Sequence, residues 1–217
     1  MDIVPMTFEV LTAIGCLVWK RGMFDYMDYC CEVGMPETSC SSQRGYLGAQ
    51  LAGLSEDVAF ILCDTPGVCD TNANAFAFAA SYMDKPFYQL NYPSVIGDDR
   101  SQKYHIDDYK EMVRFIEHHS GKKLDYDRLA EVLAEIDRQD AITAEIEDML
   151  MAVPTPIPPI YNLIIHASRF CFSGHPEYTE LLEVMRESAM ERMEKGVPGL
   201  RAGEEKVRTF MCYIDHY

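Results

Sequence analysis

The sequence predicts an α/β fold: a Rossmann-like parallel sheet with flanking helices, followed by a helical segment and the start of a second α/β domain. The first observation is a short apolar run that leads through a polar loop and a helical stretch into a second short apolar run. Such continuous runs are typical of strands buried on both faces of a parallel sheet. The second is helical spacing of apolar residues through most of the later half. We place the domains at residues 1–120, 121–203 and 204–217.

The chain begins with two predicted helices. The first runs from Thr7 to Lys20, with Thr7 as a cap and Glu9 in the first turn, where the helix dipole favours a carboxylate. Pro36 then bounds a polar loop. The second helix is expected over Ser41–Ala52, directly after that loop.

A strand–helix–strand unit follows. Val58–Leu62 is the first predicted strand, and Ala73–Met83 is the helix that connects it to the second strand, Phe87–Leu90. The loop Cys63–Asp70 joins the first strand to this helix, and the helix is expected to be capped by Asp70, Thr71 or Asn72. In open α/β sheets ligands bind at the carboxyl ends of the strands. This loop is therefore the expected location of a functional site.

The later half is predicted to be helical. Tyr104–Ser120 is an amphipathic helix closed by Gly121, and Asp125–Met151 is a second one, ended by a proline-rich connector. Tyr178–Lys195 is a third. The pattern leaves His166–Ser173 unassigned, and Lys206–Met211 is expected to be a strand.

Composition narrows the function classes. The formal net charge of -16 excludes the basic surface that nucleic-acid binding requires, and it argues against binding to an anionic membrane. The longest apolar stretch, Val10–Trp19, is too short to span a bilayer and lacks the features of a signal peptide. We therefore expect a cytoplasmic protein. In that reducing compartment each of the 8 cysteines is a core residue, a metal ligand or a reactive thiol.

Cys40 and Cys69 are the candidate metal ligands, because both lie in polar loops next to the predicted ends of elements. No C-x-x-C pair is present, so the spacing by itself favours ordinary buried cysteines over a metal centre. The other thiols are interpreted as core or strand residues: Cys16, Cys30, Cys31, Cys63, Cys171 and Cys212.

Histidines and nucleotide motifs offer weaker alternatives. His118 and His119 end a helix, where positive charge suits the dipole. A zinc site formed by His166 and His175 around Cys171 remains a minor alternative. No nucleophile elbow, P-loop or dinucleotide-binding glycine pattern occurs, so the sequence gives no support to those enzyme classes.

Several ordered segments carry a family resemblance. Met35–Ser42 is a loop that contains the dipeptide Cys-Ser, and Gly67–Asp70 follows a predicted strand and ends in the dipeptide Cys-Asp. Lys85–Pro93 contains a predicted strand that begins after Lys-Pro and is followed by a proline. Together with Gly121–Leu129 and the start at Val4–Met6, this order resembles the 2-hydroxyacyl-CoA dehydratase family, which also contains benzoyl-CoA reductase subunits.

The resemblance implies two α/β domains per subunit, with a [4Fe–4S] cluster between them held by three cysteines. Cys40 and Cys69 match two of those positions. It also implies a related second subunit, an ATP-hydrolysing activator that supplies one electron, and an acyl-CoA substrate. In the family's dehydratases the thioester carbonyl binds the open iron and is reduced to a ketyl radical anion, which allows the 2-hydroxyl to leave and the 3-hydrogen to become acidic.

The third cysteine of the family lies much later, in the second domain of longer chains. The resemblance therefore implies either an N-terminal piece of such a subunit or a short paralogue without a complete cluster. Cys212 could be proposed as the third ligand, but the favoured interpretation of this residue is an ordinary thiol in a strand. Benzoyl-CoA reductase-like chemistry, a non-catalytic role in assembly or binding, and an unrelated α/β protein with structural cysteines remain alternatives. No catalytic acid or base is assigned, since ordinary surface roles explain Arg44 and Asp70 equally well.

Overall fold

The computed structural model describes residues 3–6, 22–53, 57–64, 69–93, 97–200 and 204–208. The chain divides into two compact units, Met1–Leu124 (unit 1) and Asp125–Tyr217 (unit 2). The predicted helix Thr7–Lys20 lies outside the described residues.

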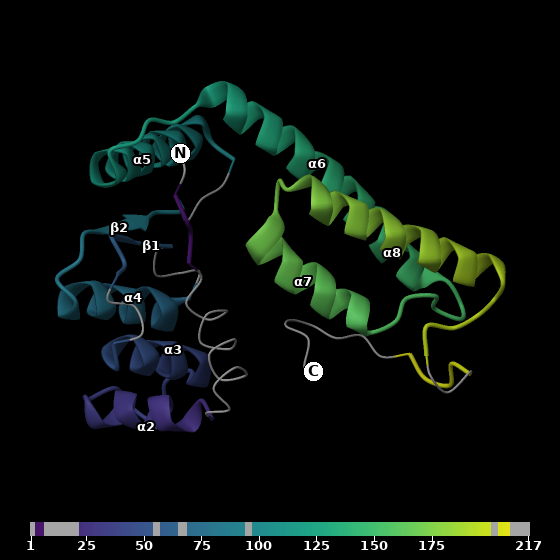
Figure 1. Cartoon of the computed structure of the whole chain (residues 1–217), viewed down its shortest axis with the longest axis horizontal. Coiled ribbons are helices and arrows are strands. Elements are labelled where there is room, and N and C mark those ends of the chain that lie inside the picture. The colour runs from purple at the N-terminus through teal and green to yellow at the C-terminus, as the bar shows by residue number, and fades with distance from the viewer. Residues whose placement is uncertain are drawn as a thin grey trace. The chain divides into compact units, whose positions relative to one another are not determined.

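Unit 1 is a stack of layers (Figure 1). Helix α2 packs on α3, α3 packs on α4, and α4 covers one face of a pair of strands, while α5 contacts β2 from the other face. The elements are α2 (Phe24–Glu32), α3 (Ser41–Leu51), β1 (Ile61–Asp64), α4 (Asp70–Tyr82), β2 (Phe87–Leu90) and α5 (Asp99–Ser120).

The strand pair confirms the predicted parallel unit. β1 and β2 are parallel, with Ile61 opposite Phe87 and Asp64 opposite Leu90, and α4 connects them. β2 has the predicted bounds, but β1 begins three residues later than the predicted strand because pairing with β2 starts only at Ile61. The described residues form a sheet of two strands. This is an α/β arrangement, and the larger Rossmann-like sheet of the prediction is not confirmed.

Small side chains allow the helices of unit 1 to approach closely. A Cβ on Gly48 of α3 would lie 1.9 Å from the main-chain oxygen of Tyr26 in α2, so only glycine fits there. On its other side α3 packs against α4, whose buried residues are all alanines. Tyr46 lies between these helices with 0% of its surface exposed, and its ring contacts Phe76 at a centroid distance of 5.2 Å.

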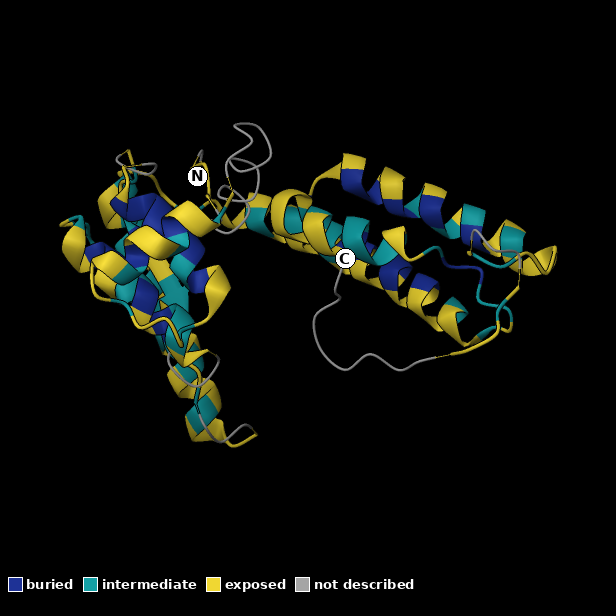
Figure 2. Cartoon of the chain, turned by 90° about the horizontal axis from the view of Figure 1, so that it is seen from below, coloured by how far each residue is buried: buried dark blue, intermediate teal, exposed yellow. Residues whose placement is uncertain are grey.

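Unit 2 is helical. Its elements are α6 (Tyr126–Asp148), a 3-10 turn (Met149–Met151), α7 (Ile160–Phe172) and α8 (Pro176–Glu194). Figure 2 shows buried residues alternating with exposed ones along the helices of this unit. Buried residues of the three helices, together with Ile157 from the connector before α7, form a core of Ile142, Ile146, Ile157, Ile165, Tyr178, Leu182, Met185 and Ala189.

The predicted helices of unit 2 are confirmed with small shifts at their ends, and the unassigned segment His166–Ser173 belongs largely to α7. Residues 204–208 contain no helix or strand, and the rest of the predicted strand Lys206–Met211 lies outside the described residues. The predicted domain bounds, including the start of a second domain at residue 204, remain predictions.

Candidate metal centre

Cys40 and Cys69 occupy equivalent positions in the fold. Each is the N-cap residue of a helix, Cys40 of α3 and Cys69 of α4. The main-chain oxygens of these cysteines accept the first helical hydrogen bonds, from Arg44 N and Ala73 N, both at 3.0 Å. Both cysteines are exposed, and neither side chain forms a cap hydrogen bond. The structure therefore presents two sulfurs at the starts of two helices that pack against each other.

A cysteine is a poor choice for this position if stability alone matters. N-caps are usually Ser, Thr, Asp or Asn, whose side-chain oxygens accept from amides of the first turn, whereas sulfur is a weak acceptor. From the sequence we expected Asp70, Thr71 or Asn72 to cap α4, and this prediction is wrong by one to three residues because Cys69 itself is the N-cap residue. Where local sequence departs from what stability favours, function is the usual reason.

Polar side chains connect the elements that carry the two cysteines. The Tyr46 hydroxyl of α3 donates to Asn72 Oδ1 in the first turn of α4, at 3.3 Å. Asn72 Nδ2 in turn donates to Asp64 Oδ1, at the carboxyl end of β1, also at 3.3 Å. These contacts were not predicted from the sequence, although an aspartate at the end of a buried strand is a signal that could have indicated them.

Cys63, at the carboxyl end of β1, is an alternative thiol, but its environment argues against a ligand role. Its Sγ lies 3.5 Å from Asp64 Oδ1. Burial, followed by this hydrogen bond, raises the pKa of the Cys63 thiol to about 12. Since the thiolate is the form that binds metal, a thiol whose pKa is raised above its usual value is a weak candidate.

Of the remaining described thiols, Cys30 is buried, Cys31 is partly buried and Cys171 is exposed. Cys30 is 1% exposed and donates to Met35 Sδ at 3.3 Å, and burial raises its pKa, which agrees with the predicted core role. Cys31 accepts from Arg44 Nη1 at 3.3 Å. The predicted core role of Cys171 is wrong, because this residue is exposed on α7; α7 buries Ile165 instead. Cys16 and Cys212 lie outside the described residues.

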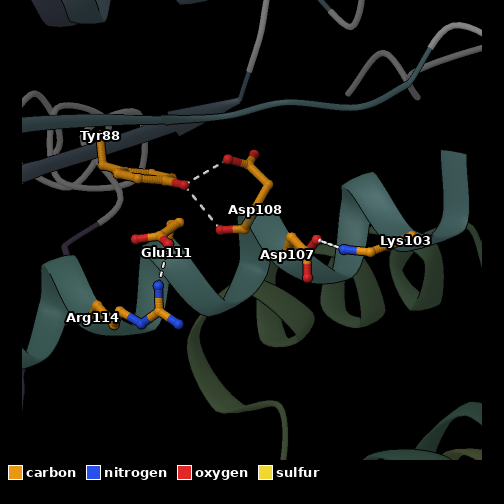
Figure 3. A network of polar contacts seen from close by, with 6 residues as sticks. All are labelled: Tyr88, Lys103, Asp107, Asp108, Glu111 and Arg114. Carbon is orange, nitrogen blue, oxygen red and sulfur yellow. Dashed lines mark hydrogen bonds and ion pairs between the residues drawn. The ribbon is translucent and has the colours of Figure 1, made fainter. Parts of the chain in front are cut away.

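The carboxyl end of β2 is held by a separate set of contacts on α5 (Figure 3). The Tyr88 hydroxyl lies 2.6 Å from Asp108 Oδ1, and Asn91 N donates to Asp108 Oδ2 at 2.6 Å. Burial and the nearby carboxylate raise the pKa of Tyr88 well above its usual range, so the hydroxyl remains a donor. Two ion pairs lie along the same helix and are exposed, Lys103 with Asp107 and Arg114 with Glu111.

A cavity of about 380 Å³ lies between α2, α3 and α4. Its walls are mainly apolar, with Leu47, Leu51 and Phe78 among them. Its polar lining includes Ser39 and Thr71, one residue before Cys40 and two residues after Cys69. Ligand pockets commonly combine apolar walls with a few polar groups in this way.

Comparison with known proteins assigns the chain to a family. Residues 1–217 match the family model described as 2-hydroxyglutaryl-CoA dehydratase, D-component. The chain belongs to this family. The resemblance drawn from the Cys-Ser loop, the Cys-Asp pair and the Lys-Pro strand is thereby confirmed. The search among curated proteins found no match.

Membership of the dehydratase D-component family implies a partner subunit in a dehydratase complex. Within the part of the chain that the structure describes, no helix combines the length and apolarity needed to cross a membrane.

The side chains of Cys40 and Cys69 are suited to serve as two of the ligands of an iron–sulfur cluster. Cluster irons are bound by cysteine thiolates, and the positive ends of helix dipoles favour the negative charge of a thiolate-ligated cluster. Cys40 and Cys69 provide both features. Among the described residues no group of three His, Cys, Asp or Glu side chains could hold a metal ion, so a third ligand would have to come from outside them.

Proposed function

We propose that this chain is a subunit of a cytoplasmic 2-hydroxyacyl-CoA dehydratase-type enzyme in which Cys40 and Cys69 bind a [4Fe–4S] cluster. One observation carries the proposal. Two exposed cysteines begin two packed helices, at positions where an oxygen side chain would stabilise the helix better. A role for sulfur explains that choice, and family membership supplies the class of reaction.

A cluster with three protein ligands supplies an open iron that acts as a Lewis acid and a one-electron donor. The residues of this chain have three tasks beside it. Cys40 and Cys69 provide sulfur ligands, and the amide groups at the starts of α3 and α4 stabilise negative charge. The cavity near Ser39 and Thr71 takes an apolar part of the acyl-CoA and keeps water away from it.

A related second subunit and an ATP-hydrolysing activator complete the proposed system. The activator delivers the electron, and the second subunit completes the enzyme. Activity is therefore expected only when both are added to this chain with an acyl-CoA thioester.

Anaerobic reconstitution with iron and sulfide tests the proposal. The protein is compared with its Cys40→Ala and Cys69→Ala variants by iron and sulfide content, EPR and Mössbauer spectroscopy. Each variant is expected to lose most of the cluster, because two remaining ligands hold it poorly. Cys171→Ala serves as the matched control, because it also removes an exposed thiol, which lies on α7. This variant is expected to leave the cluster unchanged.

Equal iron and sulfide uptake by the wild type and both variants would overturn the assignment of the ligands. A folded protein that takes up no iron, even with the second subunit present, would instead indicate a non-catalytic member of the family that serves assembly or binding.

A further inference from the structure

Three side chains from three different elements meet near the start of α4. Tyr46 of α3 bonds to Asn72 of α4, and Asn72 bonds to Asp64 of β1. We propose that these three are positioning residues, which hold α3, α4 and β1 in one register and thereby fix the sulfurs of Cys40 and Cys69 relative to each other.

The packing between α3 and α4 explains why a polar contact is needed. The buried surface of α4 consists of Ala73, Ala75, Ala79 and Ala80. Apolar contact has no preferred direction. Apart from the contact between the Tyr46 and Phe76 rings, the buried side chains that α4 offers here are short, so packing alone restrains the register of the two helices only in part. A hydrogen bond between the helices restrains it further. Tyr46 lies about 9 Å along α3 from its cysteine, and Asn72 about 4.5 Å along α4 from its own, by the rise of a helix.

The chemistry of the three groups defines one arrangement. The Asp64 carboxylate can only accept, so it must face the amide nitrogen of Asn72, which leaves the amide oxygen for the Tyr46 hydroxyl. Tyr46 is fully buried, so losing this partner would be costly. The main-chain oxygen of Asp64 accepts from Gln89 Nε2 at 3.2 Å, which ties the chain of contacts to β2.

The effect on a cluster rests on the proposed function, whereas the effect on the helices does not. Groups that orient metal ligands change metal affinity by about 10- to 100-fold when they are removed. If Cys40 and Cys69 bind iron, a looser register between α3 and α4 should therefore weaken the cluster without removing either ligand.

Tyr46→Phe is the most informative variant, because it removes one hydroxyl and keeps the ring in the core. At equal initial iron content, we expect about tenfold faster iron loss to a chelator, with a changed EPR line shape and a shifted reduction potential. Tyr178→Phe is the matched control. Tyr178 in unit 2 is also buried, at 4% exposed, and its hydroxyl donates to Ile165 O at the same 3.3 Å.

Asp64 offers a test by conservative replacement. Asp64→Asn keeps an oxygen that can accept from Asn72, whereas Asp64→Ala removes it. The asparagine variant is expected to retain the wild-type EPR signal and potential, and the alanine variant to resemble Tyr46→Phe. Wild-type signals in both Tyr46→Phe and Asp64→Ala, whatever their thermal stability, would overturn the proposal.

A cluster-free measurement separates this inference from the proposed function. Hydrogen exchange in the apoprotein follows the amides of Arg44 and Ala73, which close the first turns on the two cysteines. Tyr46→Phe is expected to raise exchange at both amides about fivefold, and Tyr178→Phe to change neither. If the wild type binds no iron, the proposed function fails and this exchange alone decides the inference. Unchanged exchange would then refute it.

Discussion

Two buried glutamines show how differently the two units treat polar groups. Gln139 of unit 2 is 3% exposed, and its whole amide is bonded. Its Nε2 donates to His175 O at 2.9 Å and to Thr179 Oγ1 at 3.0 Å, and its Oε1 accepts from Gly174 N at 3.0 Å. Gln50 of unit 1 is 4% exposed, and in the described part of the chain neither of its amide atoms has a partner.

The helix starts differ in a similar way, although not between the units as wholes. Helix α6 of unit 2 begins on Asp125, which accepts from Arg128 N at 3.0 Å, and α5 of unit 1 begins on Asp98, which accepts from Ser101 N at 2.6 Å. Helices α3 and α4 of unit 1 begin on cysteines without a cap bond, and α8 of unit 2 begins on His175 without one. The helices that carry the thiols therefore do not follow the rule that α5 and α6 follow. The difference indicates that sequence in this part of unit 1 is determined by a task other than folding.

The largest expected effect on stability comes from replacing each of the two glutamines by methionine. Gln139→Met leaves buried partners unbonded and is expected to lower the free energy of unfolding by about 3 kcal/mol. Gln50→Met replaces an unbonded amide by an apolar chain of similar shape, so stability should stay equal or rise. Urea denaturation of both variants measures this. Equal losses would show that the contrast between the units does not exist.

The sequence predicted the path of the chain better than its contacts. The apolar run and the Lys-Pro step located β2 correctly, and Gly121 ends α5 in the left-handed conformation, with a φ of 68°. Helix α2 was missed because its hydrophobic pattern is short, although Tyr26 and Cys30, one turn apart, form its buried face. Periodicity describes one element at a time, so contacts between elements were beyond its reach.

The candidate centre was found only in part for the same reason. Cys40 and Cys69 were chosen from their polar loops and the family pattern, and the structure adds that both begin helices. Asn72 was predicted only as one of three alternative caps, because an asparagine near a helix start usually has that role. Its bonds to Tyr46 and Asp64 depend on how α3, α4 and β1 pack, which no local pattern encodes.

A smaller effect on stability is expected at Tyr88, a residue of unit 1 whose hydroxyl, unlike the amide of Gln50, has a hydrogen-bond partner. Tyr88→Phe removes the hydroxyl beside Asp108 and is expected to cost about 1 kcal/mol. The folded protein raises the pKa of Tyr88 above its ordinary value of 10.0, so the stabilisation is fully present below pH 10 and is lost as the pH rises further. Unfolding titrations between about pH 9 and pH 11, roughly one unit either side of the ordinary tyrosine pKa, should show a steeper decline in stability for the wild type than for the variant. Parallel curves would contradict the assignment.

The central claim is that Cys40 and Cys69 are retained for a cluster and not for the helices they begin. The most direct measurement uses the double variant Cys40→Asn, Cys69→Asn, because asparagine is a good N-cap and does not replace a cysteine ligand of a cluster. Apoprotein stability and reconstituted iron content are measured together. We expect the variant to be more stable by about 1 kcal/mol per helix and to bind no [4Fe–4S] cluster. A variant that keeps the cluster, or that loses stability as an apoprotein, would contradict this account.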